Sequence, residues 1–130
     1  MTLVFDTSAL TLLLSNNDKI VKRFSRISYE CALIPLATDA EMRYGFRHGN
    51  KEADNLAIYK LFKQQFNLEV ALPDQNTATI YAELASWARL HGVSLSNNDI
   101  WIAAAAIQVG GELFTTDIDF ARLPQVRLVK

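Results

Sequence analysis

Short hydrophobic runs alternate along this chain with longer segments in which apolar residues recur at helical spacing. Each short run is bounded by polar or turn-forming residues, which is typical of buried β-strands. The pattern therefore predicts five strands, at residues 3–5, 31–34, 68–72, 113–115 and 126–129.

The intervening segments predict six helices, at residues 8–14, 18–25, 38–48, 51–66, 76–91 and 99–109. The fourth is amphipathic, because apolar side chains such as Leu56, Tyr59 and Phe62 fall at helical intervals. The last is apolar nearly all round and is expected to lie inside the domain. Strands that alternate with helices favour an α/β fold, a parallel sheet covered by helices on both faces.

Local sequence signals refine the prediction around the second strand. Pro35 cannot donate to a sheet ladder, so pairing is expected to end there. Thr38 and Glu41 have the spacing of a capping box, which predicts the start of the third helix. Cys31 is the only cysteine, which excludes an internal disulfide and a Cys-based zinc cluster and favours a buried thiol in a reducing compartment.

Composition limits the classes of protein that this chain can represent. Its 130 residues, 50% of them hydrophobic, predict one globular domain over residues 1–130. The net charge of −1 leaves nucleic-acid binding to local basic patches, such as residues 19–26 and 43–51. No run is long enough to span a membrane, and Asp6 interrupts the one stretch that imitates a signal sequence. We expect a cytoplasmic protein without a membrane partner.

Four acidic residues lie where a strand-like run gives way to a helix or turn: Asp6, Glu41, Asp99 and Asp117. Strands of like direction open onto one face in a parallel α/β domain, so residues far apart in sequence can meet there. Gathered carboxylates repel one another unless a cation neutralises them. Oxygen ligands without a nearby cysteine favour Mg²⁺ or Mn²⁺ over zinc. Candidates to orient these acids are Thr7, Ser8, Asn98, Thr115 and Thr116.

Each acid also has an ordinary structural explanation. Asp6 is placed to cap the first helix, and Glu41 completes the capping box with Thr38. Asp99 suits the positive end of the last helix, while Asp117 and Asp119 suit a turn. From the residues alone, both explanations stay open.

Other catalytic patterns are absent. No glycine-rich phosphate loop follows the first strand, which argues against dinucleotide and nucleoside-triphosphate binding in the usual manner. Ser8 has no G-x-S-x-G context. His48 and His91 lie at helix ends, where a favourable interaction with the helix dipole is expected.

Four segments, in order along nearly the whole chain, resemble those of PIN-domain ribonucleases, and most closely the VapC-type toxins of type II toxin–antitoxin pairs. They are FDTS at residues 5–8, AEMRYG at 40–45, NDIWIAA at 98–104 and FTTDIDF at 114–120. The resemblance implies a PIN-like three-layer α/β/α fold with a five-stranded parallel sheet.

The resemblance also implies a function. It makes Asp6, Glu41, Asp99 and Asp117 the catalytic, metal-binding set, supported by Ser8, Asn98, Thr115 and Asp119. It implies a Mg²⁺- or Mn²⁺-dependent endoribonuclease that hydrolyses RNA phosphodiester bonds to 5′-phosphate and 3′-hydroxyl ends. It further implies the toxin component of a toxin–antitoxin module, a homodimer with a cognate antitoxin as partner.

Two alternatives belong to other classes. A receiver-type signalling domain needs a phosphorylatable aspartate after the third strand and a lysine after the fifth, for which the chain offers only Asp74 and Lys130. The second is a PIN-like RNA- or partner-binding module with little or no nuclease activity.

Overall fold

The computed structural model describes residues 1–130 as strands and helices in alternation. The strands are β1 (Thr2–Phe5), β2 (Cys31–Pro35), β3 (Glu69–Ala71) and β4 (Glu112–Phe114). The α-helices are α1 (Thr7–Leu14), α2 (Asp18–Ser25), α3 (Leu36–His48), α4 (Glu52–Gln65), α5 (Gln75–Leu90) and α6 (Asn97–Gln108). A short 3₁₀ helix, η1 (Ile118–Arg122), follows β4.

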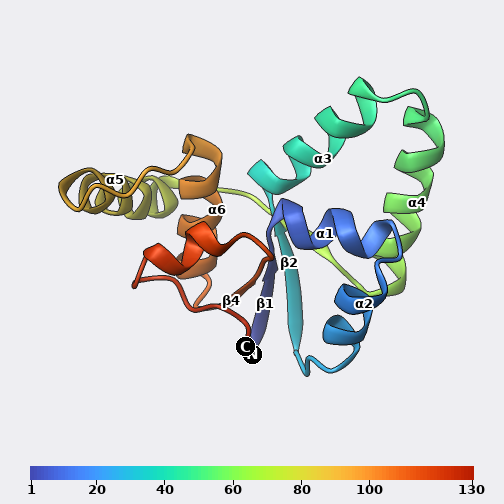
Figure 1. Cartoon of the computed structure of the whole chain (residues 1–130), viewed down its shortest axis with the longest axis horizontal. Coiled ribbons are helices and arrows are strands. Elements are labelled where there is room, and N and C mark those ends of the chain that lie inside the picture. Colours follow the sequence, from blue (N-terminus) through green and yellow to red (C-terminus); the bar gives the residue numbers. More distant parts are fainter.

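All four strands are parallel and form one sheet in the order β3-β2-β1-β4. The predicted α/β class and parallel sheet are therefore confirmed. Figure 1 shows α1 to α4 on one side of the sheet and α5 and α6 on the other. Because the strands run in one direction, their carboxyl ends lie at the same end of the sheet, where α1 and α3 begin.

The prediction of a fifth strand at residues 126–129 is wrong. Leu128 makes only an isolated parallel bridge to Leu113, so the sheet has four strands. β4 is only three residues long, and the chain returns beside it after a turn in which the Val126 N–H donates to the Leu123 carbonyl at 3.2 Å. There the Leu113 N–H donates to the Arg127 carbonyl at 2.8 Å and the Val129 N–H donates to the Leu113 carbonyl at 3.0 Å, so this segment bonds to one residue of β4.

Two details around β2 also differ from expectation. Cys31 is exposed rather than buried, because it is the first residue of β2 and pairs with Thr2 at the open end of the sheet. Pairing does end at Pro35, but α3 begins at once with Leu36. The predicted capping box does not form, and the Thr38 hydroxyl donates instead to the Phe5 carbonyl at 2.9 Å.

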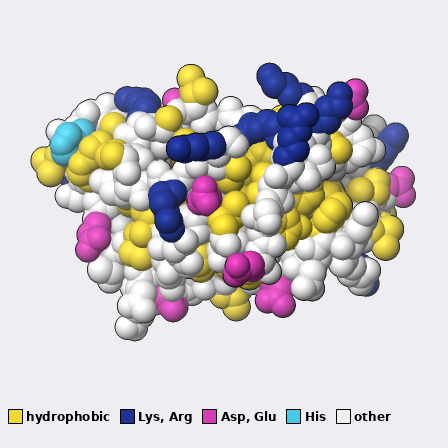
Figure 2. Space-filling model, turned by 90° about the horizontal axis from the view of Figure 1, so that it is seen from below, with side chains coloured by type: hydrophobic (Ala, Val, Ile, Leu, Met, Phe, Trp, Pro, Cys, Tyr) yellow, Lys and Arg dark blue, Asp and Glu magenta, His cyan; other side chains and the backbone are white.

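Charge is unevenly distributed over the surface. Figure 2 shows the face at the amino-terminal ends of the strands, where Lys and Arg side chains gather on the α2 side above hydrophobic side chains. Helix α2 contributes Lys19, Lys22 and Arg23, although the net charge of the whole chain is −1. None of the helices combines the length and hydrophobicity needed to cross a membrane.

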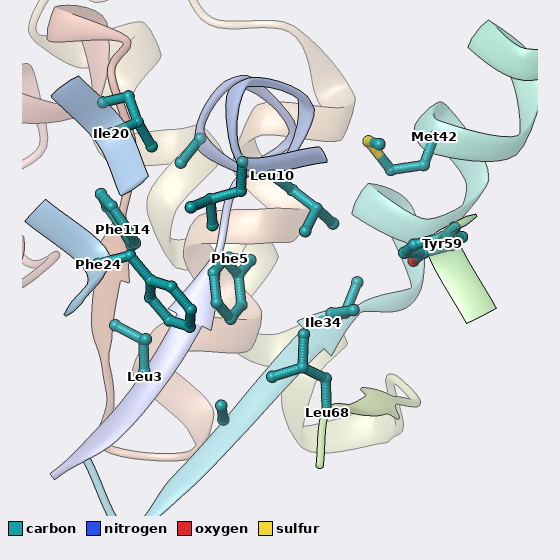
Figure 3. Packing of buried hydrophobic residues seen from close by; sticks show 13 residues of the cluster. Leu3, Phe5, Leu10, Ile20, Phe24, Ile34, Met42, Tyr59, Leu68 and Phe114 are labelled. Atoms are coloured by element: carbon teal, nitrogen blue, oxygen red, sulfur yellow. The ribbon is translucent and has the colours of Figure 1, made fainter. Parts of the chain in front are cut away.

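Two hydrophobic clusters fix the sheet between its helical layers. Leu3 and Phe5 of β1 pack against α1 to α4 in one cluster, whereas Val4 points the other way into a second cluster with α5 and α6. Figure 3 shows Phe5 close to Phe24 and Leu10 in the first cluster. As predicted, α6 is largely buried: Ile102, Ala103 and Ala104 are 0% exposed. The carboxyl end of β1 is thus rigidly held.

Candidate functional site

Asp6 follows β1 directly and is only 4% exposed. It stands at the cap position of α1, yet its carboxylate makes no capping bond. Instead Oδ2 accepts hydrogen bonds from Ser8 Oγ at 2.7 Å and from Thr115 Oγ1 at 2.6 Å. The chain donates no hydrogen bond to Oδ1. The structure therefore rejects the capping explanation for Asp6 and leaves one carboxylate oxygen free.

The two hydroxyls around Asp6 also organise the segment after β4. The Thr116 N–H donates to Ser8 Oγ at 3.0 Å, and the Asp117 N–H donates to Thr115 Oγ1 at 3.0 Å. Asp117 then caps η1, because its Oδ1 accepts the Asp119 N–H at 2.9 Å. Ser8 and Thr115 thus tie the beginning of the chain to its last acidic segment.

Glu41 lies one and a half turns into α3 and reaches across to α1. Its Oε1 accepts a hydrogen bond from Thr7 Oγ1 at 2.9 Å. Burial raises the pKa of Glu41 above its ordinary value, the Thr7 bond opposes this, and the charges of Asp99 and Asp6 raise it further. Glu41 therefore faces the other acids rather than the start of its own helix.

Asp99 occupies the first turn of α6, where Ser96 is the helix cap and its Oγ accepts the Asp99 N–H at 3.1 Å. Burial raises the pKa of Asp99, the interactions with Ser96 lower it, and the charges of Asp6 and Asp117 raise it. The four predicted acids thus lie within electrostatic reach of one another, as their placement at the strand ends predicts.

No basic side chain neutralises this cluster. The ion pairs within the chain involve Glu30, Asp39 and Glu52, and none includes Asp6, Glu41, Asp99 or Asp117. Carboxylates that are partly buried, mutually repelling and unpaired fit a hard cation such as Mg²⁺ or Mn²⁺.

The side chains are nevertheless not arranged as a closed metal cage. No group of three or more His, Cys, Asp or Glu side chains can hold a metal ion where they stand. The donor chemistry fits a divalent cation, but direct coordination by three of these residues requires side-chain movement, with water as an alternative bridge. Their role as metal ligands stays a prediction.

Three of the four predicted supporting residues contact the acidic set, and the fourth does not. Ser8 and Thr115 bind Asp6, and Asp119 contacts Asp117 through its backbone. Asn98 is exposed and its side chain makes no hydrogen bond within the chain. Asp74, the candidate phospho-acceptor, is instead the cap of α5, where it accepts the Asn76 N–H and the Gln108 amide.

One positioning residue, Ser96, escaped the sequence reasoning, and another, Thr38, was predicted with the wrong partner. Ser96 binds the Asp99 backbone, and the spacing Ser96-x-x-Asp99 is itself a recognisable signal for a helix start. Thr38 holds the first turn of α3 against the last carbonyl of β1. Its buried contact with a residue 33 positions away leaves no local signal in the sequence.

Comparison with solved structures finds the same fold. The chain is similar to VapBC2 from Rickettsia felis bound to promoter DNA, with 24% identity, 99% and 98% of the two chains covered and a TM-score of 0.89. DNA-bound VapBC from Salmonella typhimurium gives 24% identity, coverages of 99% and 97%, and a TM-score of 0.87. VapBC-5 from Mycobacterium tuberculosis, a toxin–antitoxin system, gives 25% identity, coverages of 99% and 98%, and a TM-score of 0.76.

No curated protein sequence matches the chain. The family model for the PIN domain, in contrast, matches residues 3–126. That match includes all four strands except for Thr2, the first residue of β1, and every acidic residue described above. The resemblance recognised in the sequence is thereby confirmed, and the chain belongs to the PIN domain family.

Proposed function

We propose that this protein is a Mg²⁺- or Mn²⁺-dependent endoribonuclease and the toxin component of a toxin–antitoxin module. The observation that supports this most is a group of acids without a basic partner on a PIN fold. Besides burial, the charges of Asp99 and Asp6 raise the pKa of Glu41, and the charges of Asp6 and Asp117 raise the pKa of Asp99. Isolated helix caps would not act on one another in this way. A shared cation accounts for the cluster.

In this proposal Asp6, Glu41, Asp99 and Asp117 hold the cation, directly or through water. When bound, a divalent cation activates water and stabilises negative charge on the scissile phosphate. The attacking water adds to phosphorus and the 3′ oxygen leaves, which gives 5′-phosphate and 3′-hydroxyl ends. Ser8 and Thr115 keep Asp6 oriented, and Thr7 orients Glu41. No carboxylate becomes a covalent nucleophile.

The decisive experiment compares purified wild type, Asp6→Asn and Asp18→Asn on single-stranded RNA. EDTA treatment should stop cleavage by the wild type, and added Mg²⁺ or Mn²⁺ should restore it. Asp6→Asn should lower cleavage by at least about 100-fold, whereas Asp18→Asn should retain it, because Asp18 is exposed in the first turn of α2. Full activity of Asp6→Asn would overturn the assignment.

A protein partner is part of the proposal, and one surface suits it. An apolar groove of about 330 Å³ lies between α1, α2 and α4, lined by residues that include Leu14, Val21, Phe24, Ile58 and Leu61. Val21, Ile58 and Leu61 are 38%, 49% and 64% exposed. Helix α2, which lines one side of the groove, also carries Lys19, Lys22 and Arg23, and we therefore call it the basic-rimmed groove. We assign it to an amphipathic antitoxin segment with acidic residues, because a second copy of the chain would bring like charges together.

A different groove suits a second copy of the chain. This uncharged groove, about 300 Å³, lies between the start of α3, the β3–α5 loop and α6, and includes Leu36, Ala40, Leu72, Trp101 and Val109. None of its lining residues is charged. In a twofold interface each patch meets its own copy, so a patch free of charge avoids repulsion. We assign this groove to a homodimer.

The alternative, a PIN-like binding module with little nuclease activity, is favoured by one observation: no three candidate ligands can hold an ion where they stand. The two functions differ in cells. Expression of the wild type should arrest growth, and Asp99→Asn should relieve that arrest if cleavage causes it. Equal toxicity of both proteins would favour the binding module.

A further inference from the structure

Gly45 lies within α3, where glycine weakens a helix relative to alanine because it loses more backbone freedom on folding. Nothing in the backbone requires glycine there, since Gly92 and Gly110 are the only glycines with positive φ values. Packing does not require it either, because a Cβ atom at Gly45 would meet nothing within 4 Å. Within this chain, what glycine provides is open space.

That space belongs to a hollow of about 350 Å³ between α1, α3 and α4, whose arrangement Figure 1 shows. We call it the α1–α3 groove. Helix α1 contributes Thr11, and Ser15 follows its last residue. Helix α3 contributes Glu41 and Gly45, and helix α4 contributes Asn55. Hydroxyl and amide groups therefore line a groove that reaches a member of the acidic set.

Spacing along α3 extends this arrangement. Glu41, Gly45 and His48 lie four and three residues apart, so they share one face of the helix. The ring of His48 stacks on Tyr44 with centroids 5.7 Å apart, and Tyr44 is 69% exposed. An acid, an open space and an aromatic pair thus follow one another along a single helix.

We propose that the α1–α3 groove holds one unpaired ribonucleotide next to the scissile phosphate. This inference rests on the proposed ribonuclease function and adds the position of a substrate subsite. A volume near 350 Å³ lies at the small end of ligand pockets, which suits one nucleotide rather than a duplex. Single-stranded RNA is bound through base edges and through stacking on aromatic side chains. Hydrogen-bonding groups line this groove, and the stacked pair Tyr44 and His48 lies outside the lining on the same helix.

The polarity of the lining favours RNA over a protein segment. Three of the eight residues that line the α1–α3 groove are hydrophobic, against eight of ten in the basic-rimmed groove. A protein helix gains its affinity by burying apolar side chains, for which this groove offers little surface. A nucleotide, in contrast, can bond to the Asn55 amide and donate to the oxygens of Thr11 and Ser15, whose own hydrogens are directed to Met42 and Leu12.

The test fills the space without disturbing the helix. Leucine and alanine have similar helix propensities, so Gly45→Leu and Gly45→Ala differ mainly in the volume that they place in the groove. Ala82→Leu, at an exposed position of α5, controls for an added surface leucine. Circular dichroism and thermal unfolding should show that all three variants fold.

Binding is measured in the Asp6→Asn background, so that the result does not depend on hydrolysis. The probe is a fluorescein-labelled, twelve-nucleotide single-stranded RNA of random sequence, followed by anisotropy. Gly45→Leu should weaken binding by about tenfold or more, the scale of one lost stacking contact, and Gly45→Ala and Ala82→Leu should bind like the parent. With Asp6 intact, Gly45→Leu should raise KM more than it lowers kcat.

The inference and the proposed function can fail separately. If the protein binds RNA and Gly45→Leu weakens that binding but no variant cleaves, only the nuclease proposal fails. If Gly45→Leu binds like Gly45→Ala, or if the Asp6→Asn parent does not bind the RNA, the subsite is overturned. A Gly45→Leu variant that loses self-association while it keeps RNA affinity would assign the space to a protein contact and also overturn the inference.

Discussion

Two hydroxyls donate to the same oxygen of Asp6, whereas Glu41 receives a hydrogen bond from Thr7 alone. Asp6 is therefore held in one orientation from two sides. Glu41 and Asp99 carry the electrostatic cost of the cluster, since burial and neighbouring acids raise the pKa of both. At the scale of single residues, the site combines one firmly oriented carboxylate, Asp6, with two acids, Glu41 and Asp99, whose charged forms are destabilised.

These pKa shifts predict how stability depends on pH without a cation. The pKa values of Glu41 and Asp99 are higher in the folded chain than in the unfolded one, so the native state retains their protons longer as pH rises. Their contribution to stability is fully present below the ordinary carboxyl pKa and is lost as pH rises through the raised values.

Neutral variants should therefore stabilise the metal-free protein. In EDTA at pH 7, Glu41→Gln and Asp99→Asn should raise Tm by roughly 2–4 °C, because each removes a partly buried charge that other acids repel. Differential scanning calorimetry measures the effect, with Asp18→Asn as the exposed control. A lower Tm for both variants would contradict the electrostatic account of the cluster.

At the scale of elements, three side-chain contacts position α3. Thr38 holds it to β1, Glu41 joins it to α1, and Asp39 joins it to α4. Asp39 is 6% exposed and accepts hydrogen bonds from Tyr59 Oη at 2.7 Å and Arg43 Nε at 2.9 Å. The helix that carries Glu41 and Gly45 is thus fixed on several sides.

The contact between α3 and α4 can be tested by a substitution that removes a single oxygen atom. Tyr59→Phe removes the hydroxyl that donates to buried Asp39, and should lower the free energy of unfolding by about 1–3 kcal/mol. Urea unfolding measures this loss. Tyr44→Phe is the matched control, because Tyr44 is 69% exposed and its hydroxyl makes no hydrogen bond within the chain. Equal stability of both variants would show that the Asp39 contact contributes little.

The same helix shows where sequence reasoning succeeds and where it stops. Periodicity and turn residues predicted all four strands and all six α-helices, but they missed the short helix η1 and predicted a fifth strand where only a single bridge at Leu128 forms. The interpretation of Thr38 and Glu41 as a capping box was wrong, because local spacing contains no information on partners in β1 and α1. The meeting of the acids at one end of the sheet was predictable from topology, whereas the residue that each hydroxyl binds was not.

At the scale of the whole molecule, two apolar surfaces differ in charge. Neither groove has a charged residue in its lining, but the basic-rimmed groove is lined by Val21 and Phe24 of α2, the helix that also carries Lys19, Lys22 and Arg23. A net charge of −1 conceals this separation. The distribution of charge, which composition alone cannot reveal, is what distinguishes a surface for a partner from a surface for a second copy.

A charge placed in the uncharged groove should prevent self-association. Leu72 lines this groove and is 73% exposed, so Leu72→Glu should leave the fold intact. In a twofold dimer the substitution sets two like charges against each other. Light scattering after size exclusion should give a dimer for the wild type and a monomer for the variant. Leu90→Glu, at a 79% exposed position of α5 outside the groove, should remain dimeric.

The bond from Thr115 to Asp6 spans 109 positions of sequence and has a consequence for the order in which the protein becomes active. During synthesis Asp6 leaves the ribosome early, but β4, Thr115 and Asp117 follow only after most of the chain. The acidic set therefore stays incomplete on every nascent chain until the last strand has docked beside β1. If the proposed function is right, a ribonuclease built in this way cannot cut RNA while most of it is still being made.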